Sequence, residues 1–420
     1  MTITQFTKFS DLSRTMKDTA IFVWVIIGIL IIFGFQTDSL AYTVKEDRES
    51  SELFKMLSDI IDVFDKKYYQ SVSSKKMLKE AINGMINSTD PYSYLLPPEA
   101  FPDEIILGNR GYGAINLSTV VLNGYITIIS PIQGTNAYKS NIRTRDKIVM
   151  VDGKPIKEVW DFHSKIRGNI GTPVILTIDR NNMKNTMNVT IIRDNIPFNN
   201  VRELILEPGY CYIRITPLQD NTAEYLKKSL EKHEKKGALK GLILDLRNNS
   251  EGLLDQAINI SDFFLDDGTI VSIACRNKKE EMIFRANPDK MQRNYPIVVL
   301  INEGTAKEAE IIAGALQDNK RAIILGINSF GYGTIQNVQR LNSGYGINFT
   351  IAQYITPSGR EIEKNGIIPD VLVDMPLEID NDIKSDGLIQ IALEILKKTP
   401  SSQFEDVLLT AKKIIANRVH

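Results

Sequence analysis

Cysteine and histidine are both scarce in this chain. Its 420 residues include only two cysteines, Cys211 and Cys275, and three histidines. No group of these residues has the spacing of metal ligands, so we expect neither a structural zinc site nor another metal or cofactor. For the two cysteines the sequence leaves two alternatives open, a disulfide in an oxidising compartment or two buried free thiols.

Net charge is also nearly absent. The chain has 50 lysines and arginines against 51 aspartates and glutamates, which leaves a formal charge of −1. A balance so close to zero excludes a general electrostatic attraction to nucleic acid or to anionic lipid. The hydrophobic share of 43% is typical of a globular protein, and the length predicts two or three domains.

An unbroken apolar run lies near the N-terminus, at residues 20–35, with three basic residues before it. Residues 39–41 after it (Ser-Leu-Ala) are spaced like a signal-peptidase site. The run is longer than a typical signal-peptide core and shorter than the ~20 residues that span a bilayer comfortably. We therefore expect residues 1–45 to be a signal or anchor segment, and both forms stay open. The basic flank places the rest outside the cytoplasm, in the bacterial periplasm or anchored to the inner membrane through residues 20–35.

Two kinds of pattern follow this segment. Hydrophobic residues at intervals of three and four predict a helical pre-domain over residues 46–105, which ends in a proline-rich turn. Short β-branched runs then predict a small β-rich domain over residues 106–195, with a hairpin at Asp152-Gly153. Two short helices are expected in it, at 135–140 and 159–166.

The second half of the chain alternates strands and helices. This order is typical of an α/β layer with crossover helices, which we expect over residues 196–378, followed by a helical tail over 379–420. The expected strands are 210–215, 241–245, 270–274, 297–301 and 322–325, and the expected helices are 222–235, 253–265, 306–317, 387–398 and 404–415.

Several motifs resemble, in order, those of the carboxy-terminal (tail-specific) processing peptidase family. They are 81–101 (AINGMINSTDPYSYLLPPEAF), 128–156 (IISPIQGTNAYKSNIRTRDKIVMVDGKPI), 241–254 (GLILDLRNNSEGLL), 304–326, 330–336 and 353–370 (QYITPSGREIEKNGIIPD). The resemblance implies a multi-domain α/β and β fold. It consists of a helical pre-domain, a PDZ domain and a peptidase-like α/β core with the layering of ClpP and crotonase, followed by C-terminal helices.

The catalytic pair of that family is altered here. The family cuts peptide bonds with a serine nucleophile and a lysine general base. Its nucleophile lies in a run like N-x-G-S/T-A-S-A-S-E, which here reads NEGTAKEAE with Lys307 at the serine position. Its base lies in F-G-K-G-x-x-Q, which reads FGYGTIQ with Tyr332 at the lysine position. Loss of either member costs several orders of magnitude in rate, so the resemblance predicts a non-catalytic relative.

The oxyanion loop is altered as well. Where the family has R-N-N-P-G-G, this chain continues after Arg247-Asn248 with Asn249, Ser250, Glu251 and Gly252. A carboxylate at 251 opposes the stabilisation of a developing anion. The neighbours Asp318 and Gln336 are retained, but both have structural work open to them, as a helix-end partner and a strand-end hydrogen bonder.

The sequence leaves three states open for Lys307. It can be a solvated lysine on the first turn of a helix, or it can pair with Glu251, Glu308 or Glu310. As a third alternative, Thr305 or Ser329 could attack a substrate with Lys307 as the base, although nothing in the sequence orients such a pair.

The expected PDZ domain offers a peptide site. PDZ domains add a peptide strand to a sheet edge and hold its C-terminal carboxylate on the backbone N–H groups of a glycine-rich loop. Gly111, Tyr112, Gly113 and Ala114 are the candidate loop, with Ile115 and Leu117 lining a side-chain pocket. A simple turn is the alternative.

We therefore expect an exported, non-catalytic protein that binds polypeptide C-termini in a regulatory or scaffold role. The family resemblance implies assembly with itself or with an active relative. The rival is an active serine-type C-terminal processing endopeptidase, and a relic without a function beyond folding is a third alternative.

Overall fold

The structure is a computed structural model. It describes residues 48–419 except 99–114, 157–160, 181–185, 195–199, 236, 289–292 and 376–382. The expected signal or anchor segment at 1–45, including the apolar run at 20–35, lies outside the described residues. Among the helices that are described, none is both long and apolar enough to cross a membrane.

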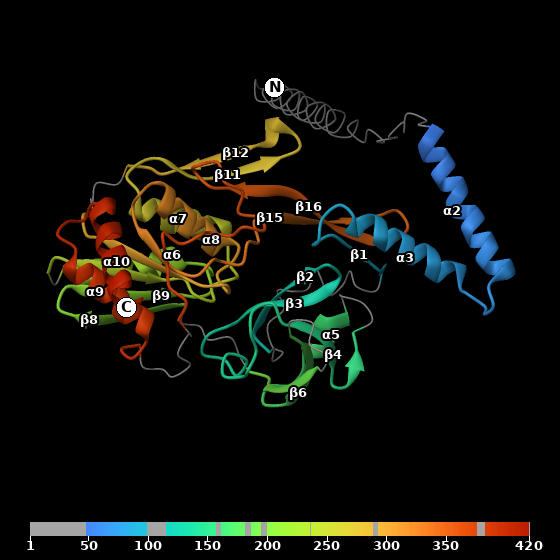
Figure 1. The fold of residues 1–420 in the computed structure, drawn as a ribbon, viewed down its shortest axis with the longest axis horizontal. Coiled ribbons are helices and arrows are strands. Elements are labelled where there is room, and N and C mark those ends of the chain that lie inside the picture. Colours follow the sequence, from blue (N-terminus) through green and yellow to red (C-terminus); the bar gives the residue numbers. More distant parts are fainter. Residues whose placement is uncertain are drawn as a thin grey trace, which may run out of the picture. The chain divides into compact units, whose positions relative to one another are not determined.

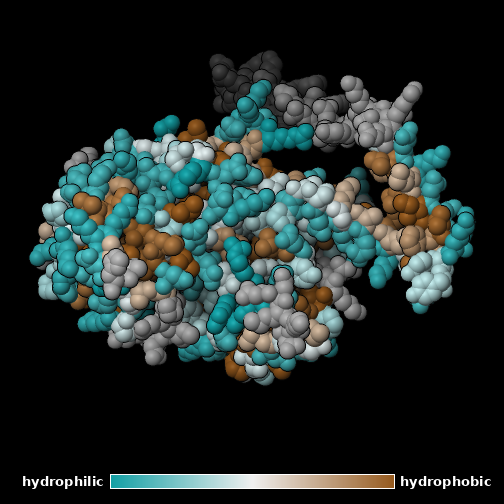
Figure 2. All heavy atoms as spheres, viewed as in Figure 1, coloured by the Kyte–Doolittle hydropathy of each residue, from teal (hydrophilic) through white to brown (hydrophobic). Residues whose placement is uncertain are grey.

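The chain divides into two compact units, Met1–Ala81 and Ile82–His420. The expected helical pre-domain contains two helices, α2 (Arg48–Lys67) and α3 (Ser74–Asn87), and the second crosses the unit boundary (Figure 1). One face of α2 carries exposed apolar side chains, which appear as a brown patch in Figure 2. They are Leu53, Met56, Ile60, Val63 and Phe64.

The β-rich domain is an antiparallel sheet with strand order β2-β3-β4-β6-β7, and β5 pairs with β4. Its elements are β2 (Leu117–Leu122), β3 (Tyr125–Pro131), β4 (Lys147–Val151), β5 (Lys154–Pro155), α5 (Asp161–Ile166), β6 (Pro173–Asp179) and β7 (Met187–Ile192). The sheet buries its own apolar core, which includes Ile128, Phe162 and Leu176. The turn between β4 and β5 lies at Asp152-Gly153, as predicted, and both residues have positive φ angles of 49° and 71°.

The helix expected at 135–140 is wrong. This segment forms separate turns, in which Thr135 and Ser140 donate side-chain hydrogen bonds to the carbonyls of Ile132 and Ala137. Hydroxyl groups that bond the nearby backbone in this way compete with helix formation. The second expected helix is present as α5.

The α/β core is built on a six-stranded sheet with the order β17-β14-β13-β10-β9-β8. All pairs are parallel except β8 with β9. The strands are β8 (Val201–Glu207), β9 (Tyr210–Ile215), β10 (Gly241–Asp245), β13 (Ile297–Ile301), β14 (Ile323–Gly326) and β17 (Val371–Leu372).

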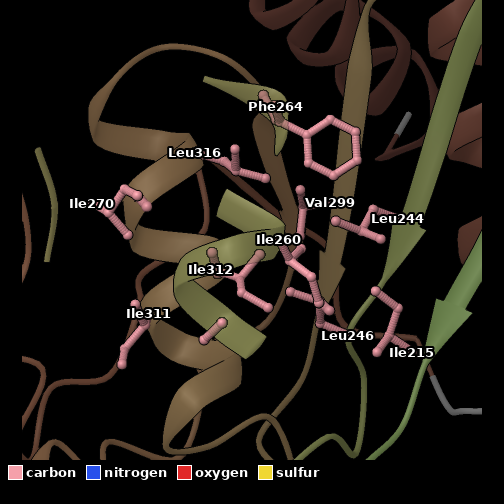
Figure 3. Packing of buried hydrophobic residues seen from close by; sticks show 14 of the residues in the cluster. Ile215, Leu244, Leu246, Ile260, Phe264, Ile270, Val299, Ile311, Ile312 and Leu316 are labelled. Carbon is pink, nitrogen blue, oxygen red and sulfur yellow. The ribbon is translucent and has the colours of Figure 1, made fainter. Parts of the chain in front are cut away.

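Helices cover both faces of this sheet. On one face lie α6 (Thr222–Glu234), α7 (Leu254–Phe264) and α8 (Glu308–Asp318), and Figure 3 shows Ile260 of α7 and Ile312 of α8 packed against Leu244 and Val299. On the other face lie α9 (Gly387–Lys398) and α10 (Phe404–Val419), which bury Ile243 and Val298. The helical tail that we expected to follow the core is therefore one of its layers.

A second sheet adjoins the core. Its order is β1-β16-β11-β12, with β15 also paired to β16. The strands are β1 (Tyr94–Leu96), β11 (Thr269–Cys275), β12 (Met282–Arg285), β15 (Thr334–Arg340) and β16 (Gly346–Ile355), and a short 3-10 helix, η3 (Lys278–Glu280), precedes β12. Cys211 in β9 and Cys275 in β11 are both free thiols, so of the two alternatives the structure has the unbridged one, with Cys211 buried and Cys275 partly buried.

Candidate functional site

Lys307 lies at the start of α8, directly after the loop that follows β13. Its backbone has φ 54° and ψ −123°, a conformation that L residues rarely adopt. The loop before it is held on both sides, because Ala306 donates its N–H to the carbonyl of Asn249 and Phe330 donates to that of Thr305. Strained residues of this kind are concentrated at active sites, where the surrounding structure enforces them.

Tyr332 lies in the loop between β14 and β15, and its side chain is buried. Its ring packs on Tyr92, with the two ring centroids 4.8 Å apart. The Nζ atom of Lys307 lies 5.3 Å from the centroid of the same ring, which is within the range of a cation–π contact. The structure thus brings together the two positions that the motifs identify with the catalytic pair.

Glu310 ties the two loops together. Its carboxylate is fully buried and accepts the backbone N–H groups of Lys307, Gly331 and Tyr332 and the hydroxyl of Ser329. Burial raises the pKa of Glu310 to about 7, although these hydrogen bonds oppose the shift. Glu310 therefore bonds the backbone N–H of Lys307. The ion pair between Glu310 and the Lys307 ammonium, one of the alternatives left open by the sequence, is not formed.

Among the described residues, neither Thr305 nor Ser329 donates its hydroxyl to Lys307, and both are buried. Thr305 is fully buried and donates its hydroxyl to the carbonyl of Leu246 at 2.9 Å. Ser329 donates its hydroxyl to Glu310 at 2.6 Å and accepts the N–H of Ile367. The structure therefore supports neither version of the replacement mechanism.

The surroundings of Lys307 are acidic. Burial raises the pKa of Glu308, the charge of Glu251 raises it further, and the charge of Lys307 lowers it. Among the described residues, the ammonium of Lys307 contacts the ring of Tyr332 and no carboxylate within 4 Å, and Lys307 is only partly exposed. Its state lies between the first two alternatives, since it is neither fully solvated nor bonded to a carboxylate.

The oxyanion loop is packed into the core. Asn249 is fully buried and donates its side-chain amide to the carbonyl of Ile215. Gly252 lies against Leu218 so closely that an added Cβ would meet the Leu218 Cβ at 2.3 Å. Because Glu310 takes the N–H of Lys307, that donor is not available to a developing oxyanion.

A buried ion network that the sequence did not reveal positions this loop. The guanidinium of Arg247 contacts Asp245 at 2.7 Å and Asp386, the N-cap residue of α9, at 3.0 Å. Arg214 lies 3.6 Å from Asp245. Burial alone would raise the pKa of Asp245, but the two guanidinium groups hold it at about 2.

The two retained neighbours have structural roles. Asp318 ends α8 and accepts hydrogen bonds from the backbone of Ser358 and the guanidinium of Arg360. Gln336 lies in β15 and donates to the hydroxyls of Thr334 and Thr350. These bonds account for both residues without any role in a reaction.

The predicted peptide site is described only in part. Its candidate loop, Gly111 to Ala114, lies outside the described residues. Ile115 is fully buried in the core of the β-rich domain, and its place in a side-chain pocket stays a prediction, because the loop that would complete this pocket lies outside the described residues. Leu117 is partly buried against the same core, at the start of β2, which is the edge strand of the sheet.

Comparisons with known proteins agree with this architecture. The profile of peptidase family S41 matches residues 209–373, and that of the PDZ domain matches residues 113–191. The carboxy-terminal-processing protease of Bartonella bacilliformis is 33% identical over 360 residues, which cover 84% of this chain and 83% of that protein. The carboxy-terminal processing protease CtpA of Bacillus subtilis is 35% identical over 361 residues, which cover 82% and 76%.

A solved structure leads to the same family. The photosystem II D1 C-terminal processing protease superposes with a TM-score of 0.64 at 28% identity, covering 79% of this chain and 89% of that one. The predicted combination of a PDZ domain with an α/β peptidase fold is confirmed. The chain is a PDZ-containing member of peptidase family S41, related to the carboxy-terminal processing proteases.

Proposed function

We propose that this protein is a non-catalytic member of its family, which binds polypeptide C-termini through its PDZ domain in a regulatory or scaffold role. One observation carries the proposal. The two positions of the catalytic pair lie side by side, but one holds an ammonium and the other an aromatic ring, 5.3 Å apart. A serine-type reaction needs an accessible hydroxyl beside its base, whereas Thr305 and Ser329 are buried and donate their hydroxyls to groups other than Lys307.

The PDZ domain supports the binding half of the proposal. Its strand β2 lies at the edge of the sheet and pairs only with β3 among the described strands. An edge strand can accept an extended peptide by backbone hydrogen bonding. We place this binding outside the cytoplasm, in the periplasm or at the inner membrane, on the strength of the apolar run at residues 20–35.

A cleavage assay tests the loss of catalysis. The purified protein is incubated with casein and with a C-terminally tailed peptide, and we expect no products by mass spectrometry. Cleavage by the natural protein that Lys307→Ala abolishes would contradict the proposal. The double variant Lys307→Ser with Tyr332→Lys shows whether the scaffold is still competent, and its two single variants are the matched controls. If it stays inactive, adding Glu251→Gly tests the oxyanion loop.

A binding assay tests the PDZ role separately. Fluorescence anisotropy is measured with labelled peptides that have free C-termini, and the same peptides with amidated C-termini are the control. Binding of the free forms alone is expected, since the proposed loop recognises a carboxylate. Equal binding of both forms, or none, would refute C-terminal capture.

The alternative function is that of an active serine-type C-terminal processing endopeptidase. Family membership favours it. It requires a reactive hydroxyl, so a fluorophosphonate probe should form a covalent adduct on Thr305 or Ser329. We expect no such adduct in the intact mass of the treated protein.

A further inference from the structure

The PDZ domain contacts the altered site directly, through the hairpin of β2 and β3. Val120 and Ile129 from this hairpin are buried in one apolar cluster with Ala306, Phe330 and Tyr332 of the core and with Tyr92. Tyr332, at the position of the catalytic base in the family motif, is thus part of the contact between the two domains.

Polar groups join the same surfaces. The hydroxyls of Ser130 and Ser250 lie 2.6 Å apart, and Ser118 donates its hydroxyl to the carbonyl of Ser250. All three serines are buried, Ser250 with 3% of its surface exposed. Nearby, Arg145 donates to the carbonyl of Phe330 at 3.1 Å and lies over its ring.

The residue types at these positions suit a dry contact. An amine at 332, which a serine–lysine pair requires, would bring an ammonium into the apolar cluster that contains Val120 and Ile129, and its desolvation is costly even near the carboxylates of Glu363 and Glu308. A tyrosine ring instead adds apolar area and stacks on Tyr92. At 250, a residue without a hydroxyl would lose the bond to Ser130.

We infer that the altered positions 332 and 250 form a docking surface that holds the chain's own PDZ domain closed on the peptidase-like core. In this arrangement, the two positions serve as structural contacts between the domains. The inference rests on the proposed function in one respect, because it takes position 332 as that of a lost catalytic base. If the contact between the PDZ domain and the core were disproved, the proposed loss of catalysis would still stand. Val120 and Ser118 belong to β2. The strand whose outer edge is proposed to take up a peptide therefore also contacts the core through its side chains.

A disulfide trap in the full chain tests the contact. Ser130→Cys with Ser250→Cys places two thiols where the hydroxyls now lie 2.6 Å apart, close to the reach of a disulfide. Mild oxidation should link most of the chains, as shown by peptide mapping without reductant. The control pair is Ser130→Cys with Ser358→Cys, because Ser358 contacts Asp318 at the far end of α8. No disulfide in the first pair, with its circular dichroism spectrum intact, would overturn the inference.

Hydrogen exchange of the full chain gives an independent readout. Tyr332→Lys and Ser250→Ala should each speed amide exchange in β2 by about tenfold, because the closed arrangement protects that edge strand. Tyr332→Phe keeps the ring and should leave β2 unchanged. Exchange in β7, at the other edge of the PDZ sheet, reports whether the domain itself stays folded. Unchanged exchange of β2 in Tyr332→Lys would count against the docking surface, whatever the cleavage assay shows.

Discussion

Glu310 is the residue on which the geometry of the site depends. One buried carboxylate receives donors from the start of α8 and from the loop that carries Tyr332. Such a group fixes two segments only while it stays bonded, and its removal leaves several buried N–H groups without an acceptor. The positions of Lys307 and Tyr332 are therefore set by Glu310, which is itself not one of the two residues at the catalytic positions.

The raised pKa of Glu310 predicts a pH dependence of stability. The group ionises at about 4.5 in the unfolded chain and at about 7 in the folded one, so its contribution is fully present below pH 4.5 and is lost as the pH rises through 7. The free energy of unfolding of the natural protein, relative to Glu310→Gln, should therefore fall by roughly 1–3 kcal/mol between pH 5 and pH 8. Urea unfolding of both proteins at a series of pH values measures this free-energy difference.

The control for this experiment is Glu361→Gln, which changes an exposed glutamate. A difference between the natural protein and Glu310→Gln that stays constant over this pH range would show that Glu310 is ionised at all of these pH values, as its four donors alone would favour.

Among the elements, the tail helices are more closely joined to the site than their place in the sequence suggests. α9 packs on the central sheet, and its N-cap residue Asp386 also bonds Arg247 at the start of the oxyanion loop. A helix near the C-terminus and a loop in the middle of the chain thus share one buried ion pair.

This link makes Arg247→Leu a strongly destabilising change. It leaves Asp245 and Asp386 as buried carboxylates with less compensation, and breaking such a pair typically costs about 3–5 kcal/mol. Lys397→Met is the matched control, because it breaks an exposed pair with Glu207 and should cost less than about 1 kcal/mol. Urea unfolding compares the two. Equal losses would mean that the buried network contributes no more than a surface pair.

Strongly patterned elements were the ones that the sequence predicted. β10, β13 and α9 have the expected bounds, because a short run of buried, mostly apolar residues or a clear 3.6-residue period leaves little choice. The strands β15 and β16 were missed, since they are half-exposed and carry mixed side chains.

The residues of the site also fall into some that the sequence could indicate and others that it could not. Lys307 and Tyr332 could be singled out from the sequence because each lies in a contiguous motif. The roles of Glu310 and Asp386 could not be predicted, because the role of a buried carboxylate becomes clear only from the groups that it bonds. Asp386, for example, is 139 residues from its partner Arg247 in the sequence. Local patterns carry no information about contacts over that distance.

For the molecule as a whole, the exposed apolar face of α2 points to self-assembly. We propose that a second copy covers this face, since five large apolar side chains on one helix face are unusual on a monomer. Leu53→Asp with Ile60→Asp should shift the protein to a smaller species in sedimentation velocity. The control, Ser51→Asp with Ser58→Asp, adds the same charge on the polar face of α2. A natural protein that already sediments as a single chain would exclude this assembly.

The contact between Lys307 and Tyr332 also has a consequence for evolution under the proposed loss of catalysis, since it bears on whether cleavage could be regained. A serine at 307 without an amine at 332 has no base, and an amine at 332 without the serine has nothing to activate, so neither single reversion would be selected for activity. The lysine would also enter a buried apolar cluster and weaken the fold on the way. Descendants of this gene are therefore expected to diverge further from the peptidases, and a lineage that regained cleavage would have passed through less stable intermediates.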